Sequence, residues 1–445
     1  MTSPIHWIPP DTFSPTEPGL GLPRLEGAEH EIIYDPLPCR GNVDEGGDGR
    51  YESLMHGTYV HSPSLVLHED RIIACWLQHS RDEAGSGLRI LARVGAFDDA
   101  GDNIAWGGEE TLCELVPQCM PLRRRESDYD PDEIHGGTVL GSLRAINGRL
   151  YVIGYVYAIH GATDDVFLKR QPPFAQEPIP AEHFSDHRDK GGFRHGLYYE
   201  LGIDFFQRRR IGEATLEQDT PMYTVGKARD RVEVTPGRFK AVEPLLDPYV
   251  SAAAVEEAPP DFRRDVFQSP HIGFDRRPVF APGTERLAAD GVHGLAHYTQ
   301  FRRPDGKWVV VRDNIKNPGK YYAVVKDRQG QATPPAAPTN LHGEAMPAAG
   351  ELPDGRVWIV CNARGRREMY LTLSSDGIAF DRSWSVLTID RQCDGGLGKG
   401  GGPQYFKTVT VGTNIWVIYS ITKEQIGLSR IPVGCLAARR NTRPK

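Results

Sequence analysis

Short apolar runs separated by turn residues recur along the chain. In the stretch from His56 to Arg93, the runs Ser64–Leu67 and Arg71–Leu77 flank a His-Glu-Asp turn, and a third run, Leu88–Arg93, follows a Gly-Ser-Gly turn. Runs of this length, rich in β-branched residues and bounded by turn residues, are typical of antiparallel strands. The stretch therefore predicts a three-stranded meander.

Similar units recur in the rest of the chain, and each contains one strongly apolar run. Asn147-Gly148 separates Gly137–Leu143 from Arg149–Tyr157, and Asn-Gly between two apolar runs is a strong hairpin signal. The five apolar runs are RIIACWL, RLYVIGY, KWVVVRD, RVWIVCN and NIWVIYS. Recurrent units of three to four strands favour an all-β fold, a β-propeller of about five to seven blades. The alternative is a β-sandwich with satellite elements, which accommodates a chain of this length less well.

The pattern also divides the chain. Residues 1–50 are rich in Pro and Gly, with one strand candidate at Glu31–Tyr34, and we interpret them as an N-terminal arm and closing strand. Residues 51–435 hold the recurrent units. Within them, residues 161–192 are polar and lack periodicity, which predicts a long inserted loop. Residues 436–445 form a tail.

Composition narrows the classes of function. The chain has 445 residues, of which 39% are hydrophobic, and a net charge of −7, so a nucleic-acid or membrane-surface partner is not expected. The seven cysteines are an odd number without a CxxC pair, which favours buried thiols over a disulfide framework or zinc site. The first residues show no signal peptide, so both a cytoplasmic protein and a secreted one whose leader was removed remain open.

Histidines lie at the ends of the first predicted strands. His61 opens one strand and His79 follows the next, and antiparallel neighbours bring such positions to the same edge of a sheet. Histidine titrates near neutral pH, so two at one edge indicate proton-transfer chemistry. The alternative is that both cap strands at a wet rim.

Further candidates fall on the same face if the chain is a propeller, and we expect them to bind substrate. His135 leads into a strand, His293 and His297 precede the hairpin that ends in Arg312-Asp313, and the loop KGGGPQY runs from Lys399 to Tyr405. Arg312-Asp313 can also be an ion pair at the end of a ladder. The glycine-rich loop lacks the strand and helix of a phosphate-binding loop, so no nucleotide is expected. It can equally be a connection between blades.

A set of motifs occurs in a fixed order over roughly residues 51–155 and 290–432. In order they read Y-x-H-x-P, W-x-x-H, D-E-x-x-x-G-x-R, N-G-R-L-Y-V, V-R-D, D-G-R-V-W-I-V-x-N, L-S-S-D-G-I-A-F-D, G-P-Q-Y and W-V-I-Y-S-x-x-K-E-x-I-x-x-S-R-I-P. This order resembles the sialidase-like, seven-bladed β-propellers of carbohydrate degradation. It is most similar to the lyases of ulvan and rhamnosyl-glucuronate, and to the related hydrolases of rhamnose-glucuronate linkages.

The resemblance to the lyases implies β-elimination next to a glucuronate in an anionic oligo- or polysaccharide. It places the two catalytic histidines on His61 and His79, a tyrosine on Tyr157 (with Tyr155 as the alternative) and an arginine on Arg194. An arginine neutralises the carboxylate, a histidine takes the proton, and a tyrosine or second histidine protonates the leaving oxygen. Tyr157 can also be a core aromatic, and Arg194 a solvated loop cation.

Two other classes of function stay open. One is glycoside hydrolysis, with acidic candidates such as Asp82, Glu83 and Glu133 but no carboxylate pair of diagnostic spacing. The other is a non-catalytic sugar-binding propeller, since this fold hosts many functions. True sialidases resemble the chain less, because they use an arginine triad, a Tyr/Glu pair and repeated S-x-D-x-G-x-x-W boxes, of which only Ser374–Gly377 is close. No cofactor is required for either reaction, and a structural calcium or zinc ion is left open because no spacing has ligand specificity.

Overall fold

The computed structural model describes residues 3–36, 59–79, 89–108, 110–113, 134–146, 149–160, 193–201, 208–215, 223–225, 231–233, 290, 295–314, 318–326, 336–391 and 400–437. For the strands between 110 and 233, only the backbone is described.

Four sheets are each built from strands that follow one another in sequence, and every pairing inside them is antiparallel apart from one added strand. We name each sheet after its first strand. The β3 sheet contains β3 (Tyr59–His68), β4 (Arg71–His79), β5 (Arg89–Phe97) and β6 (Ile104–Trp106), with β7 (Glu110–Cys113) also paired to β5. The β8 sheet contains β8 (Ile134–Ile146), β9 (Arg149–His160), β10 (Phe193–Leu201) and β11 (Arg208–Thr215).

The other two meanders come from the C-terminal third. The β14 sheet contains β14 (Leu295–Arg302), β15 (Trp308–Asn314), β16 (Tyr322–Lys326) and β17 (Ala337–Pro338). The β18 sheet contains β18 (Ala348–Glu351), β19 (Val357–Ala363), β20 (Glu368–Ser374) and β21 (Ala379–Thr388), and β1 (His6–Trp7) joins its outer edge in parallel to β21.

A fifth sheet joins the two ends of the described chain. The β22 sheet contains β22 (Pro403–Val411), β23 (Asn414–Ile421) and β24 (Gln425–Pro432), and β2 (Glu29–Tyr34) pairs with β24. The strand predicted at Glu31–Tyr34 is therefore confirmed. A short two-stranded sheet, β12 (Tyr223–Val225) with β13 (Arg231–Glu233), and the 3-10 turns η1 (Pro18–Gly21) and η10 (Val433–Ala437) complete the described elements.

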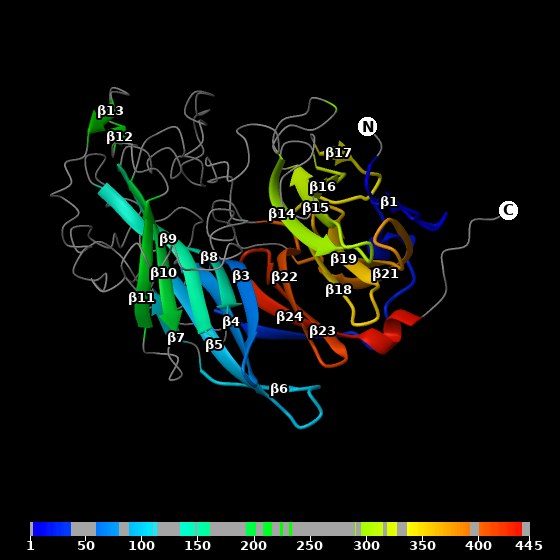
Figure 1. Cartoon of the computed structure of the whole chain (residues 1–445), viewed down its shortest axis with the longest axis horizontal. Helices are drawn as coiled ribbons and strands as arrows, with labels where there is room; N and C mark the ends of the chain where they lie inside the picture. The colour runs from blue at the N-terminus through cyan, green and yellow to red at the C-terminus, as the bar shows by residue number, and fades with distance from the viewer. Residues whose placement is uncertain are drawn as a thin grey trace, which may run out of the picture.

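The sheets are arranged side by side through their first strands. β8 contacts β3, β3 contacts β22, β22 contacts β18, and β18 contacts β14. Figure 1 shows these sheets following one another across the molecule, with the blue strand β2 beside the red strand β24. Sheets that meet through their first strands form a propeller arrangement, so the predicted all-β propeller is confirmed.

The number of blades differs from the expected seven. The described residues give four blades of consecutive strands and the β22 sheet, which is closed by β2. The five apolar runs seen in the sequence became β4, β9, β15, β19 and β23, the second strand of each sheet. Each of the five sheets contains one such strand. The expectation of seven blades came from the family resemblance and not from these strands. The insertion expected at 161–192 lies outside the described residues.

The second strands of the two C-terminal sheets are buried along their whole length. All residues of β19 and all residues of β23 are buried. They are covered on both faces because neighbouring sheets pack against each other, so they show continuous apolar runs in place of a strict alternation. This burial explains why these strands were the clearest signals in the sequence.

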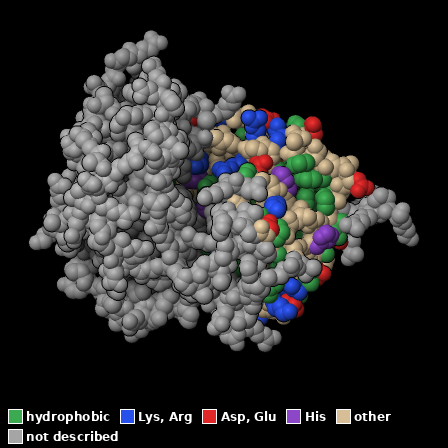
Figure 2. All heavy atoms as spheres, turned by 90° about the horizontal axis from the view of Figure 1, so that it is seen from above, with side chains coloured by type: hydrophobic (Ala, Val, Ile, Leu, Met, Phe, Trp, Pro, Cys, Tyr) green, Lys and Arg blue, Asp and Glu red, His purple; other side chains and the backbone are tan. Residues whose placement is uncertain are grey.

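Few large apolar side chains reach the surface. Among the described residues, Ile32 and Ile378 are the large hydrophobic side chains that are exposed. On the face seen in Figure 2, apolar side chains are interspersed with charged and other polar ones. No helix in the described part of the chain is both long and apolar enough to span a membrane.

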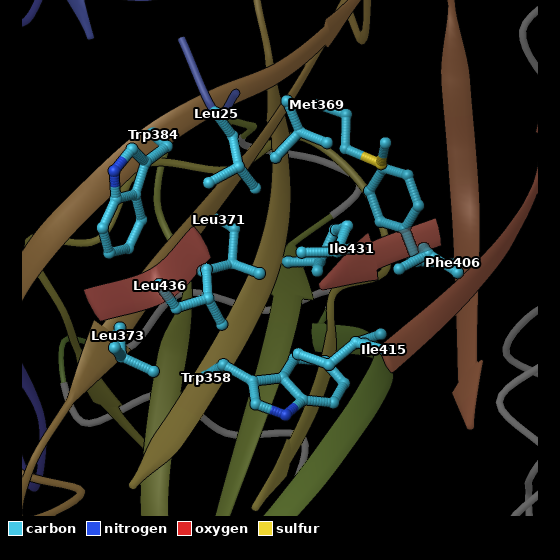
Figure 3. Close-up of a cluster of buried hydrophobic side chains, with 14 of the residues drawn as sticks. Leu25, Trp358, Met369, Leu371, Leu373, Trp384, Phe406, Ile415, Ile431 and Leu436 are labelled. Carbon is cyan, nitrogen blue, oxygen red and sulfur yellow. The ribbon is translucent and has the colours of Figure 1, made fainter. Parts of the chain in front are cut away.

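A core cluster of described residues lies between the β18 and β22 sheets. Trp358 and Leu371 from the β18 sheet meet Phe406 and Ile415 from the β22 sheet, and each has at most 1% of its surface exposed (Figure 3). Leu25 packs into the same cluster from the N-terminal arm. Full burial of one such side chain contributes about 1.5–3 kcal/mol, so this interface fixes how the two sheets sit against each other.

The turn between β20 and β21 carries the motif that resembles a sialidase box. Ser374 Oγ accepts from the amide of Gly377 at 2.9 Å, and Asp376 Oδ1 accepts from the amides of Ile378 and Ala379 at 2.7 and 2.9 Å. The side chains thus satisfy the backbone of a tight turn. The role of this motif in the fold is to shape a hairpin.

Candidate active site

Three of the first strands are irregular near their beginnings. The strand register shifts between His61 and Ser64 in β3, between Leu295 and Tyr298 in β14, and between Gln404 and Lys407 in β22. A β-bulge redirects side chains and is common beside active sites. The three bulges therefore indicate a candidate site at the beginnings of these strands.

The backbone at two of these bulges is in the left-handed region. Ser62 has a φ of 55° and Tyr405 a φ of 61°. Non-glycine residues avoid this region unless the surrounding structure holds them there. At Tyr405 the preceding glycine-rich segment allows the sharp turn, so the loop expected to connect blades also sets the position of this tyrosine.

Tyr405 lies between two histidines from different sheets. The ring centroids of His61 and Tyr405 are 4.0 Å apart, and those of His297 and Tyr405 are 5.0 Å apart. The exposed fractions are 0% for His61, 3% for His297 and 6% for Tyr405. We call these three residues the central cluster. Figure 2 shows histidine and Lys or Arg side chains together at the inner margin of the described surface.

His297 is held by an aspartate on the next strand. Asp313 Oδ2 lies 2.7 Å from Nδ1 of His297, and Asp313 Oδ1 accepts from the backbone amide of His297 at 2.7 Å. Asp313 is 1% exposed. Both carboxylate oxygens therefore fix one residue, and the imidazole ring has little freedom to rotate.

His61 is held from the β22 sheet. Its Nδ1 lies 3.2 Å from Oγ of Ser420, and this hydroxyl also lies 3.4 Å from the carbonyl oxygen of Gln404. The Ser420 side chain thus links His61 of β3 to the residue that precedes Tyr405.

The turn between β23 and β24 joins the two halves of the cluster. The amide of Val60 donates to the carbonyl of Lys423 at 2.9 Å, and the amide of Thr422 donates to the carbonyl of Gly402 at 3.1 Å. These bonds tie β3 and the loop before Tyr405 to the same turn. Its Lys423 is 4% exposed, and Nζ lies 5.7 Å from the ring centroid of Tyr405.

A second buried cation precedes Asp313 on β15. Arg312, 8% exposed, places its guanidinium carbon 5.2 Å from the ring centroid of Tyr298 and is paired in register with that residue. Lys423 and Arg312 are thus two buried positive charges, of which Lys423 lies against Tyr405 of the central cluster. Buried cations favour an anionic ligand.

The buried carboxylates in the described part of the chain are all engaged. Asp313 is bonded to His297, Glu368 to Arg364 at 3.0 Å, and Glu424 to Arg391 at 2.5 Å. Hydrolysis by the usual route needs two carboxyl groups with separate acid and base roles. In the described cluster, the side chains suited to proton transfer are histidines and a tyrosine.

Glu344 lies near the loop that precedes Tyr405. Burial acts to raise the pKa of its carboxyl, but the His342 ring, 3.8 Å away, and the amides of Arg366 and Gly365 lower that pKa below the ordinary value. Arg366 in turn donates to the side chain of Gln404 at 2.7 Å. The carboxylate therefore helps to hold the turn against which the loop packs.

The structure places the predicted site residues in two groups. His61 and Tyr405 come together in the central cluster, and Arg312 packs against Tyr298. His79 pairs with Tyr59 in register, and His61 pairs with Leu77, so the two histidines are two positions apart along one sheet edge, as predicted. The side chain of His79 is outside the described residues.

The remaining candidates lie on the β8 sheet or outside the description. Tyr157 pairs with Gly137 and with Arg194, and His135 pairs with Ile159. Tyr155, the alternative, pairs with Gly196. Their side chains are not described, so the assigned roles stay predictions. His293, Lys399, Asp82, Glu83 and Glu133 lie outside the described residues.

Sequence reasoning missed the bond between His297 and Asp313. The Pro-Asp-Gly turn at 304–306 fixes the register of β14 and β15, with Tyr298 opposite Arg312. Counting one step further places His297 beside Asp313, so the hairpin turn was a usable signal. The proximity of Tyr405 to both histidines had no such signal, because it joins strands of three sheets.

The described residues also show how potential metal ligands are arranged. In the ranges that the structure describes, no group of three or more His, Cys, Asp or Glu is arranged to hold a metal ion. The thiols of Cys75, Cys361 and Cys435, whose side chains are described, are free.

Comparison with known proteins gives a fold but no family. No family model and no curated protein matches the chain. A solved sialidase matches with a TM-score of 0.56 and 17% identity over 96% of this chain. The match covers 35% of that sialidase, so this chain spans about a third of its length.

More distant matches are also sialidases. A Trypanosoma rangeli sialidase has a TM-score of 0.44 and 9% identity over 86% of this chain and 56% of its own. A variant of the NanB sialidase from Streptococcus pneumoniae has a TM-score of 0.43 and 10% identity over 85% of this chain and 69% of its own. The first match and the sheet order agree, and the chain has the propeller-like fold found in sialidases.

Proposed function

We propose that the protein is a carbohydrate-active enzyme that breaks a glycosidic bond next to an acidic sugar, by β-elimination at the central cluster of His61, His297 and Tyr405. The observation that carries this proposal is the tyrosine held between two buried histidines, with a β-bulge at each of the three residues. The order of motifs in the sequence, similar to that of uronate lyases, supports the same reaction.

Elimination needs a base, an acid and a positive group that neutralises the carboxylate, and the central cluster offers groups for the first two. A base removes the proton from the carbon next to the carboxylate, the C–H electron pair becomes a double bond, and the bond to the leaving oxygen breaks. An acid then gives that oxygen a proton. A histidine is suited to the base, and the phenol or the second imidazole is suited to the acid.

The substrate carboxylate needs a positive partner, because its neutralisation makes the neighbouring proton acidic. Lys423 is a buried cation against Tyr405, and Arg312 is a buried cation next to Asp313 in sequence. Arg312 can bind a carboxylate through a two-pronged contact. Arg194, paired with Tyr157, is a further candidate for this role on the β8 sheet. We therefore expect a uronate-containing oligo- or polysaccharide, with glucuronate as the first choice.

Hydrolysis is the second candidate, and the sialidase-like fold is the observation that favours it. In a hydrolase of this kind Tyr405 would attack the sugar directly. His297, held by Asp313, would then act as the base for its hydroxyl. The two candidates use the same cluster but leave different products.

One assay separates the candidates. Purified protein is mixed with glucuronate-containing glycans, including ulvan, gum arabic and rhamnosyl-glucuronate oligosaccharides, and with a sialoside as the hydrolase probe. Ultraviolet absorbance and new reducing ends are recorded in the same reaction. Elimination creates a conjugated unsaturated uronate that absorbs, and hydrolysis does not.

Absorbance that rises with the reducing ends supports the lyase. Reducing ends without absorbance move the assignment to the hydrolase. Binding of a glycan by calorimetry with neither signal would contradict both reactions and would make the propeller a sugar-binding module.

A further inference from the structure

The two ring nitrogens of the buried His297 differ in their surroundings. Its Nδ1 faces Asp313, but no hydrogen-bonding partner for its buried Nε2 is found among the described residues. A buried polar atom without a partner costs free energy. Such an atom calls for a functional explanation.

The aspartate determines which nitrogen carries the hydrogen. An ionised carboxylate only accepts, so Nδ1 of His297 must donate to Asp313. In the neutral ring, Nε2 then holds a lone pair. The second bond of Asp313, to the backbone amide of His297, prevents the carboxylate from turning away.

The lone pair is on the atom opposite the aspartate. The ring of His297 also lies 5.0 Å from the ring of Tyr405, and the two planes are inclined by 73°. The bulge between Leu295 and Tyr298 puts His297 at this point of β14. The ring is therefore fixed in orientation, in tautomer and in position beside the tyrosine.

We propose that His297 is the proton acceptor of the reaction and that Asp313 is its positioning residue. This inference rests on the proposed function and assigns the base within the central cluster. His297 takes the proton from the substrate carbon through Nε2, and the resulting imidazolium is stabilised by the carboxylate of Asp313. Tyr405 or His61 then donates a proton to the leaving oxygen.

The titratable groups that the described contacts place against His297 lie on two other strands. Asp313 lies on β15 and Tyr405 on β22. Asp313 is the group bonded to the ring. The Asp313 carboxylate is therefore the group that sets the tautomer.

The Asp313→Asn variant tests the positioning role by changing one atom. The backbone amide of His297 needs an oxygen at the Oδ1 position, so the new NH2 group faces Nδ1 and donates to it. The hydrogen of the ring must then move to Nε2, and the base is lost. We expect kcat to fall by about 100- to 10,000-fold, the range for loss of a general base, with KM little changed. The Asp313→Glu variant is expected to recover part of kcat.

Two further variants complete the kinetic experiment. His297→Gln removes the base itself and should match Asp313→Asn in kcat. Glu368→Gln is the matched control, since it also changes a buried carboxylate into an amide but acts on Arg364 and Thr388. It should lower stability and leave kcat unchanged.

A measurement that needs no substrate accompanies the kinetics. Long-range nitrogen–proton NMR of protein labelled in histidine reports the tautomer of each ring, and the His297→Gln spectrum assigns the signal. We expect a hydrogen on Nδ1 in the unchanged protein and on Nε2 in Asp313→Asn.

The outcomes separate the two levels of the argument. An active protein whose His297→Gln variant keeps its kcat overturns this inference and leaves the proposed function standing. A protein without turnover on any glycan overturns the proposed function, and the NMR tautomer still decides whether the pair is built as described. A hydrogen on Nε2 in the unchanged protein contradicts the pair.

Discussion

Gly402 is the residue at which a single methyl group would disturb the central cluster. It lies three residues before Tyr405, and a Cβ atom there would be 2.7 Å from the carbonyl oxygen of Arg366, 2.8 Å from the Cα of Arg367 and 3.2 Å from the carbonyl oxygen of Ile389. All three atoms are backbone, so no side-chain rotation relieves the contact. The loop has to move.

The expected cost follows from two opposing effects. Alanine restricts the unfolded chain and would stabilise the protein by about 0.4–1 kcal/mol at a site that accepts it. Overpacking against fixed atoms destabilises by about 1–3 kcal/mol. Movement of the loop also strains two hydrogen bonds. One runs from the amide of Gly402 to the carbonyl of Arg366, at 3.0 Å, and the other from the amide of Thr422 to the carbonyl of Gly402. The cost of overpacking therefore exceeds the gain from restricting the unfolded chain. We expect Gly402→Ala to lower the free energy of unfolding by about 1–2 kcal/mol.

We expect a large loss of kcat in Gly402→Ala in addition to the loss of stability. Tyr405 follows the displaced loop, and misplacement of a reacting group by about 1 Å can lower the rate about 100-fold. The assay combines urea unfolding, followed by circular dichroism, with kcat on the glycan that the proposed assay identifies. Gly434→Ala is the control, since its Cβ would meet no atom within 4 Å. Equal or higher stability of Gly402→Ala, or full kcat in that variant, would refute the reasoning.

Three further predictions concern stability. Leu371→Ala opens a cavity in the cluster of Figure 3 and should lower the free energy of unfolding by about 2–5 kcal/mol in urea titrations; a smaller loss would mean that the sheets close around the gap. Glu344→Gln should cost about 1–2 kcal/mol at neutral pH. Because the pKa of Glu344 is lowered in the folded protein, this difference should shrink as pH falls below the ordinary value of 4.5, and a constant difference between pH 7 and 3 would contradict it. Trp7→Ala removes a buried ring and its 3.0 Å bond to Ser383, so thermal unfolding should begin at lower temperature, and an unchanged melting curve would show that β1 contributes nothing.

The strands were predictable because their signal is local. Arg71–Leu77 became part of β4, and the Pro-Asp-Gly turn at 304–306 became the β14–β15 hairpin. Apolar runs and turn residues act within a few positions, so one sequence suffices to find them. The blade count was not local in this sense, since it was taken from a resemblance.

The central cluster was predictable only in part. His61 and Tyr405 were both candidates, but 344 positions separate them in the chain. Their contact depends on the β22 sheet packing against β3, which no local pattern encodes. The bulges were equally hidden, because an extra residue in one strand shows only when its partner strand is known. For that reason the loop before Tyr405 was interpreted as a connection, although it also places the tyrosine.

The comparison of Tyr405→Phe with Tyr419→Phe tests the central claim most directly. Both changes remove one buried phenol hydroxyl, but Tyr419 lies in the core of the β22 sheet, where its hydroxyl is 2.9 Å from Oγ of Ser429. Turnover of the glucuronate glycans is measured for both variants by absorbance and by reducing ends. The account predicts that Tyr405→Phe lowers kcat by about 100-fold or more while Tyr419→Phe keeps it. Full activity in Tyr405→Phe would contradict the assignment of Tyr405 as a reacting residue of the central cluster.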